Sequence, residues 1–87
     1  MTEPEADPLG EWLKDVRTRA EDGEADSQCA LGFVYQEGRG VAQDNGEAVR
    51  WYRLAADQGY ADAQDRLGFM HQEGLGVAQD DGEARGW

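Results

Sequence analysis

The residues most suited to chemistry in this chain are two short acidic clusters. Residues 44–47 (Asp-Asn-Gly-Glu) and residues 80–83 (Asp-Asp-Gly-Glu) resemble acidic calcium-binding loops. A helix–loop–helix calcium site, however, needs oxygen ligands at alternate positions over about twelve residues, with a Glu at the end. Here the acids are adjacent, and a segment with helical spacing of apolar residues follows at once. We therefore interpret both clusters as capping boxes, in which the Asp accepts hydrogen bonds from first-turn N–H groups of a helix.

A histidine, a cysteine and a glycine pair are the other candidates for chemistry. His71 has no partner at a spacing typical of a catalytic set, and a lone Cys29 excludes an intrachain disulfide and a multi-cysteine zinc site. Residues 38–40 (Gly-Arg-Gly) resemble the start of a phosphate-binding loop, but the third glycine and the Gly-Lys-Ser/Thr ending are missing. We expect no catalytic residue, no metal and no cofactor. The alternative is a metal-binding or hydrolytic domain that uses His71 and nearby carboxylates.

The charge of the chain narrows its range of partners. Its 87 residues carry a formal net charge of −11. Nucleic acids and anionic membranes attract Lys and Arg, so the charge argues against both and favours basic partners. No apolar run approaches the roughly 20 residues of a membrane span. The N-terminal residues are acidic where a secretory signal would be basic and then apolar, so we expect a cytoplasmic protein, with secretion as the alternative.

The elements that position these residues repeat along the chain. Residues 25–51 recur as residues 61–87, an offset of 36 residues, and most aligned positions are identical. Self-similarity at a period of this length is the sequence signature of a solenoid. Each repeat predicts a first helix, a glycine-containing loop and a second helix.

Helical spacing of apolar residues predicts the bounds of these helices. First-type helices are expected at residues 25–37 and 61–73, each ended by a left-handed glycine. Second-type helices are expected at residues 46–58 and 9–22, the latter with Trp12, Leu13 and Val16 as its apolar stripe. The predicted fold is all-α: a solenoid of antiparallel helix pairs, with about four helices and a C-terminal stub.

Glycines inside the first-type helices indicate close packing. Gly32 and Gly68 occupy the same register, and each costs about 1 kcal/mol of helix stability relative to Ala. We expect the partner helix to approach too closely for a Cβ at these positions, with the small residues Ala48 and Ala55 facing them. Val41, which lies in an otherwise polar loop, is expected to close the end of the helix pair, as is Val77 in the second repeat.

Several strings resemble one known family. Residues 25–28 (Ala-Asp-Ser-Gln), 38–41 (Gly-Arg-Gly-Val) and 51–59 (Trp-Tyr-Arg-Leu-Ala-Ala-Asp-Gln-Gly) are similar to a Sel-one-like repeat, a branch of the tetratricopeptide-type α-solenoids. The resemblance covers residues 11–87. It implies a right-handed superhelix of antiparallel helix pairs and a role as an adaptor or scaffold, in bacteria often linked to signalling.

The repeat register also predicts the domain organisation. We expect a disordered acidic lead at residues 1–8 and a single repeat domain at residues 9–87. Within that domain, a partial repeat contributes the helix at 9–22, a full repeat spans 25–60 and a truncated repeat spans 61–87.

The same resemblance predicts a binding groove. In tetratricopeptide-like solenoids the first helix of each pair lines the concave face. The groove-facing positions here are Asp26, Cys29, Phe33, Gln36, Glu37, Asp62, Asp65, Phe69, Gln72 and Glu73. The implied floor is acidic, with one aromatic per repeat, and suits a protein or peptide partner with basic residues and apolar anchors. The alternative is that Phe33 and Phe69 belong to the core and the acids are simply solvated.

The C-terminal end predicts a further contact. The stub at residues 84–87 is too short to cover the helix around Leu67, Phe69 and Met70. An uncovered apolar end can pair with a second copy, so we expect a homo-oligomer through this end. The alternative is that the chain is a fragment of a longer repeat array.

Overall fold

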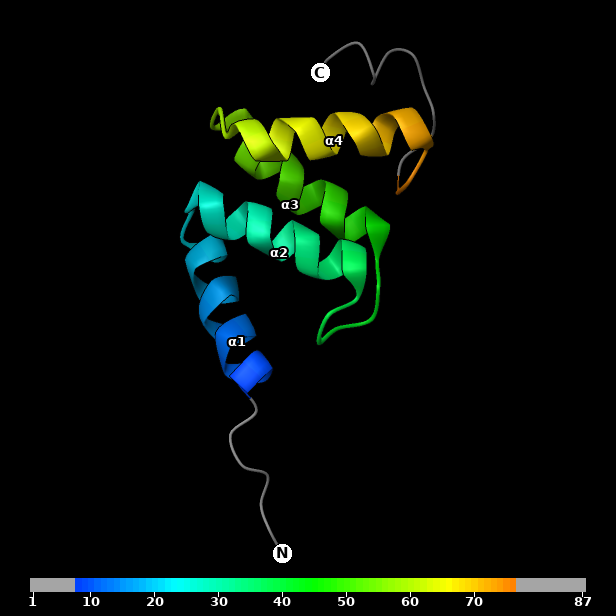
Figure 1. The fold of residues 1–87 in the computed structure, drawn as a ribbon. Coiled ribbons are helices and arrows are strands. Elements are labelled where there is room, and N and C mark those ends of the chain that lie inside the picture. Colours follow the sequence, from blue (N-terminus) through cyan, green and yellow to red (C-terminus); the bar gives the residue numbers. More distant parts are fainter. Residues whose placement is uncertain (1–7, 77–87) are drawn as a thin grey trace, which may run out of the picture.

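The computed structural model describes residues 8–76, and these residues form four α-helices (Figure 1). The helices are α1 (Pro8–Glu21), α2 (Ala25–Glu37), α3 (Asn45–Asp57) and α4 (Ala61–Glu73). The bounds of α2 and α4 are those predicted, while α1 and α3 each begin and end one residue earlier than predicted. Pro8 starts α1 rather than ending a disordered lead, in keeping with the preference of proline for the first helical turn. The rest of the expected lead and the C-terminal stub lie outside the described residues.

Short signals in the sequence set the helix ends. Gly38 and Gly74, each with φ of 70°, adopt the left-handed conformation that ends α2 and α4, as predicted. At the start of α3, Oδ1 of Asp44 accepts a hydrogen bond from the backbone N–H of Glu47 at 3.0 Å. This confirms the aspartate half of the first capping box. The second capping box, residues 80–83, lies outside the described residues.

Successive helices are antiparallel and pack on one another in chain order. α1 packs on α2, α2 on α3, and α3 on α4. α2 and α4 run in the same direction, and α3 runs back between them (Figure 1). Two first-type helices therefore present corresponding faces on one side of the molecule, which is the arrangement of an α-solenoid.

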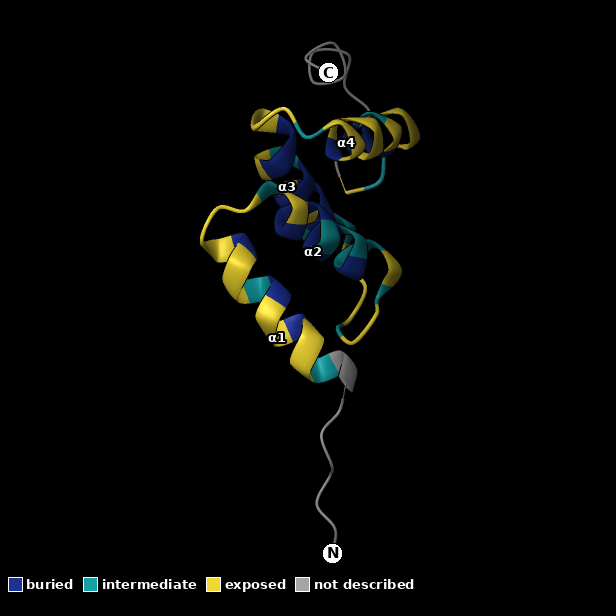
Figure 2. Ribbon diagram, turned by 60° about the vertical axis from the view of Figure 1, so that its left-hand side comes forward, coloured by how far each residue is buried: buried dark blue, intermediate teal, exposed yellow. Residues whose placement is uncertain are grey.

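The core consists of two clusters of buried side chains, which appear dark blue along the inner helix faces in Figure 2. One joins α2, α3 and α4, and the other joins α1, α2 and α3. Their members are Cys29, Ala48, Val49, Tyr52, Ala55, Ala56, Ala63, Leu67 and Met70 in the first cluster, and Leu13, Val16, Ala20, Leu31, Val34 and Trp51 in the second. Val41 packs against the second cluster, as predicted. Trp12 was expected in the apolar stripe of α1, but this was wrong: its side chain is 45% exposed.

The two helix-internal glycines differ in their surroundings. A Cβ placed on Gly32 would lie 2.6 Å from Cδ1 of Tyr52, so the predicted close approach is confirmed there. The approaching group is the Tyr52 ring rather than Ala48 or Ala55. A Cβ placed on Gly68 meets no heavy atom within 4 Å in the described structure. The second-type helix expected to face Gly68 lies outside the described residues, so close packing there stays a prediction.

A repeated hydrogen bond joins each first-type helix to the helix before it. Nε2 of Gln28 donates to the backbone carbonyl of Ala20 at 3.1 Å, and Nε2 of Gln64 donates to that of Ala56 at 3.2 Å. Both bonds span eight residues and occupy the same repeat register. The side-chain amide of Gln58 adds bonds to Gly23 O and to Oε1 of Gln28, each at 2.9 Å. The junctions between helices are therefore held by side-chain amides as well as by apolar packing.

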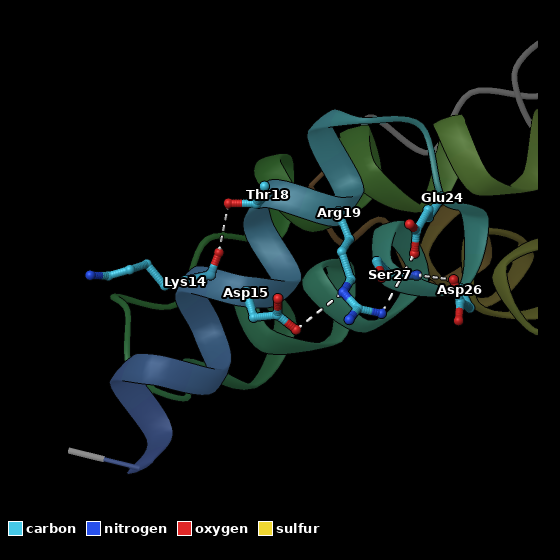
Figure 3. A network of polar contacts seen from close by, with 7 residues as sticks. All are labelled: Lys14, Asp15, Thr18, Arg19, Glu24, Asp26 and Ser27. Carbon is cyan, nitrogen blue, oxygen red and sulfur yellow. Dashed lines mark hydrogen bonds and ion pairs between the residues drawn. The ribbon is translucent and has the colours of Figure 1, made fainter. Parts of the chain in front are cut away.

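The outer face of α1 is polar. Asp15 and Arg19 form an ion pair at 3.2 Å, and Arg19 also lies 4.0 Å from Glu24 (Figure 3). The same figure shows the Thr18 hydroxyl donating to the carbonyl of Lys14. These exposed contacts contribute little stability individually. They make this face of α1 one that water can solvate.

Candidate functional site

Two hollows adjoin along the side of the molecule where α2 and α4 present corresponding faces. We call them together the α2–α4 groove. The first has a volume of about 530 Å³ and is lined by Trp12, Asp26, Cys29, Ala30, Phe33, Val34, Arg39, Tyr60, Asp62 and Arg66. The second has a volume of about 440 Å³ and is lined by Gln36, Asp62, Asp65, Arg66 and Phe69. Asp62 and Arg66 line both hollows, so the two form one continuous surface.

Most of the residues predicted for the groove lie in it. Asp26, Cys29 and Phe33 line the first hollow, Gln36, Asp65 and Phe69 line the second, and Asp62 lines both. The remaining predicted residues, Glu37, Gln72 and Glu73, line neither hollow. All three belong to the last turns of α2 and α4. Seven of the ten predicted residues therefore line the hollows, and binding of a partner by this face stays a prediction.

The groove contains exposed aromatic surface. Phe69 is 51% exposed and Trp12 is 45% exposed, while Phe33 is half-buried and has two arginines near its ring. The alternative that Phe69 belongs to the core is therefore wrong. The sequence interpretation missed Trp12 and Tyr60, because they come from α1 and from the residue that precedes α4 rather than from the repeated first-type face.

Two arginines that the sequence interpretation did not include share the floor with the predicted acids. The guanidinium carbon of Arg66 lies 5.1 Å from the centroid of the Phe33 ring, and that of Arg39 lies 5.7 Å from the same centroid. Both separations fall within the range of cation–π contacts. Arg66 follows Asp62 by one helical turn, and this i, i+4 spacing was a usable signal in the sequence. Arg39 comes from the loop after α2, where helical periodicity does not predict the positions of side chains.

The acidic residues of the first hollow gather at the helix starts. Asp26 and Asp62 occupy the first turns of α2 and α4, where carboxylates are stabilised by the helix dipole. Oδ1 of Asp26 also accepts from the N–H of Ser27 at 2.8 Å (Figure 3). Burial raises the pKa of Tyr60, and the charges of Cys29, Asp62 and Asp26 raise it further. The groove is therefore negative near the helix starts and positive around Phe33.

Cys29 lies in the core as well as at the groove. Its thiol is buried, and burial raises its pKa above the ordinary value of 9.0, with Arg66 acting in the opposite direction. A thiol with a raised pKa stays protonated at neutral pH and is a poor nucleophile. Cys29 is therefore a buried core residue that also borders the groove.

His71 is also a core residue. It is buried, and its Nε2 lies 3.5 Å from a guanidinium nitrogen of Arg53. Within residues 8–76 no three His, Cys, Asp or Glu side chains are placed to hold a metal ion together. None of the helices in the same range is long and apolar enough to cross a bilayer.

Less apolar surface of α4 is exposed around Leu67, Phe69 and Met70 than predicted. Leu67 and Met70 were expected to lie uncovered, but this was wrong: both are fully buried in the core cluster that α3 and α4 share. Phe69 alone of the three is exposed, and it faces the groove. Self-association through this end stays a prediction with less apolar surface to support it.

The fold and the groove define a class of protein: an α-solenoid built from antiparallel helix pairs, with the first-type helices lining a shared surface. Within that class the chain belongs to the Sel1 repeat family, because residues 25–60 and 61–87 both match the Sel1 repeat model. The resemblance inferred from the sequence is thereby confirmed. Sel1 repeats are typically protein-interaction scaffolds and are generally not catalytic.

Solved structures agree with this assignment. The chain is similar to a Sel1 repeat protein from Oxalobacter formigenes, with 38% identity and a TM-score of 0.79. It is also similar to c5321, a protective antigen of uropathogenic Escherichia coli with this repeat fold, with 30% identity and a TM-score of 0.56. Each comparison covers 83% of this chain but only 30% and 23% of those two chains, so the sequence spans less than a third of either. No curated protein matches the chain.

Proposed function

We propose that the α2–α4 groove binds an extended segment of a partner protein, and that the chain acts as a non-catalytic interaction module. The observation that carries the proposal is the continuity of the two hollows through Asp62 and Arg66, with Trp12 exposed in one and Phe69 exposed in the other. Exposed aromatics within a hollow are typical anchors for a partner's apolar side chains.

The stability of the fold gives little reason for Trp12 and Phe69 to be aromatic at such exposed positions. A side chain that is about half exposed contributes only part of its transfer free energy to the folded state, roughly 25 cal/mol per Å² of apolar area buried. The exposed remainder is available to a partner. Trp and Phe bury large areas on contact, so a segment that covers both would gain affinity without any rearrangement of the core.

The charges of the groove support a partner of mixed composition. Asp26, Asp62 and Asp65 favour basic residues opposite the starts of α2 and α4 and along the second hollow. The overall charge of −11 acts in the same direction over longer distances. Apolar residues of the segment would lie over Trp12 and Phe69.

A displayed peptide library selected on the whole chain tests this proposal. The affinity of a selected peptide for the wild-type chain is compared by calorimetry with its affinity for Trp12→Ala and Phe69→Ala. Each substitution should weaken binding by about tenfold or more, as expected for a central aromatic anchor. Circular dichroism should show unchanged helix content, because both side chains lie outside the two core clusters.

Leu54→Ala is the matched control. Leu54 is 39% exposed on α3 and lines neither hollow of the groove. Its substitution removes a comparable exposed apolar side chain and should leave the affinity unchanged. Failure to select any peptide, or equal affinities for the wild type and both groove variants, would refute the proposal.

A further inference from the structure

We propose that Arg39 and Arg66 form a carboxylate-binding site over the Phe33 ring, which recognises an acidic group of the bound segment. This inference rests on the proposed function and adds to it the chemical identity of one partner group. It also departs from the expectation, drawn from the net charge, of a partner that is simply basic.

The two arginines converge from different elements. Arg66 comes from the middle of α4 and Arg39 from the loop after α2, and both line the first hollow. Because both guanidinium carbons lie within 5.7 Å of one ring centroid, their separation cannot exceed the sum of the two distances. Since both arginines also line the first hollow, an anionic group that enters the hollow at Phe33 is close to two positive charges.

Neither arginine is neutralised within the described part of the chain. The ion pairs formed there by arginines involve Arg19 with Asp15 and Glu24, and Arg50 with Glu47. Asp62 precedes Arg66 by one helical turn without forming an ion pair with it. Two positive charges thus remain beside an apolar ring and lack a carboxylate partner.

The acids that share the hollow do not occupy this position. Asp26 precedes Phe33 by seven residues, about 10 Å along the axis of α2, and Asp62 precedes Arg66 by about 6 Å along α4. Both carboxylates already have a role at the starts of their helices. Within the described residues neither acid forms an ion pair with Arg39 or Arg66, so both guanidinium groups stay available to an incoming carboxylate.

The chemistry of guanidinium selects a carboxylate. The planar group can rest against an aromatic ring while its edge N–H donors stay free, and these donors match the two oxygens of a carboxylate. The Phe33 ring holds each planar group by cation–π attraction and lowers the entropy lost on binding. The carboxylate can come from a Glu or Asp side chain or from the C-terminus of the partner segment.

The test starts from the selected peptide. Each acidic residue of the peptide is replaced in turn by its amide, and in a separate peptide the terminal carboxylate is amidated. One of these changes should weaken binding to the wild-type chain by about fivefold, the upper range for a solvent-accessible charge pair. Loss on an internal change identifies a side chain as the source, and loss on amidation identifies the C-terminus.

The two arginines of the chain are then substituted, to complement the changes in the peptide. In the double variant Arg39→Met and Arg66→Met, the apolar contact with Phe33 is retained while both charges are removed. The parent peptide should bind this variant about fivefold more weakly, and the amide change should then have no further effect. Arg50→Met is the control, because Arg50 lies 4.7 Å over the Trp51 ring and lines neither hollow.

Side-chain NMR gives a readout that does not depend on the folding of the variants. The Nε–Hε resonances of Arg39 and Arg66 should shift with the parent peptide and shift less with the amide peptide. If Trp12→Ala and Phe69→Ala weaken binding but carboxylate removal changes neither affinity nor these resonances, the carboxylate site is refuted while the groove stands. If no peptide binds, both proposals fail.

Discussion

The ring of Tyr52 occupies the space that a side chain on Gly32 would need. A Cβ at that position would lie 2.6 Å and 2.7 Å from two ring carbons of Tyr52. The ring is fully buried, and its hydroxyl donates to Oε1 of Gln36 at 2.6 Å. Contact between α2 and α3 therefore depends on a missing side chain on one helix and a large one on the other.

This contact predicts opposite effects for the same substitution at equivalent positions. Gly32→Ala gains about 1 kcal/mol in helix propensity but forces the Tyr52 ring to move, at a cost of about 1–3 kcal/mol, so the net effect should be destabilising. Gly68→Ala gains the propensity term with open space around it and should stabilise by about 0.5–1 kcal/mol. Urea unfolding followed by circular dichroism measures both, and equal effects would contradict the packing difference.

The hydroxyl of Tyr52 should contribute measurably to stability. Tyr52→Phe removes its hydrogen bond to Gln36 and should lower the free energy of unfolding by about 1 kcal/mol. Tyr60→Phe is the control, since no hydrogen bond of the Tyr60 hydroxyl exists within the described residues. Thermal melts of the two variants should therefore differ, with Tyr52→Phe melting at the lower temperature. Indistinguishable melts would show that the bond adds nothing.

The start of α3 depends on one side chain. Asp44→Ala removes the acceptor for the Glu47 N–H and should cost about 1 kcal/mol of stability. Asp44→Asn keeps a side-chain oxygen at the cap and should recover most of that loss. Chemical denaturation compares the three proteins. Equal destabilisation by Ala and Asn would mean that charge, rather than the hydrogen bond, is responsible.

Stability should decrease at alkaline pH in part through Cys29. Burial raises the pKa of this thiol in the folded state above 9.0, whereas the unfolded chain releases the proton near 9.0. The stabilisation is therefore present below 9.0 and is lost as the pH rises through the higher folded pKa. Burial raises the pKa of Tyr52 as well, and this acts in the same direction at still higher pH.

The measurement is the free energy of unfolding from neutral pH to about pH 10, where the thiol of the unfolded chain is largely ionised. Cys29→Ala should show a shallower decrease than the wild type over this interval, whatever its absolute stability. Parallel curves for the two proteins would contradict a raised thiol pKa.

Repeated local signals allowed much of the fold to be predicted. The glycines at residues 38 and 74 and the aspartate at residue 44 act within one turn of chain, so their geometry follows from residue type and spacing. The partner of Gly32 could not be found this way. Tyr52 reaches it from another helix, and the exact rotation of α3 depends on how all the side chains pack together.

The groove was predictable to a similar extent. The repeat register placed Phe33, Asp62 and Phe69 on the faces that line the hollows, because it reflects the face of a single helix. Trp12 and Arg39 were missed because they enter the groove from α1 and from a loop, and their positions depend on the angles between elements. The positive charge around Phe33 was missed in part for the same reason, since Arg39 lies in a loop.

The amide hydrogen bonds of Gln28 and Gln64 affect how the amino-acid sequences of the repeats can vary. Their acceptors are the backbone carbonyls of Ala20 and Ala56, and a carbonyl is present whatever residue stands there. The hydrogen bond therefore constrains residue identity only on the glutamine side of each junction. After a duplication, residue identity at the acceptor positions is constrained by the burial of Ala20 and Ala56 in the core, and at the donor positions by the hydrogen bond itself.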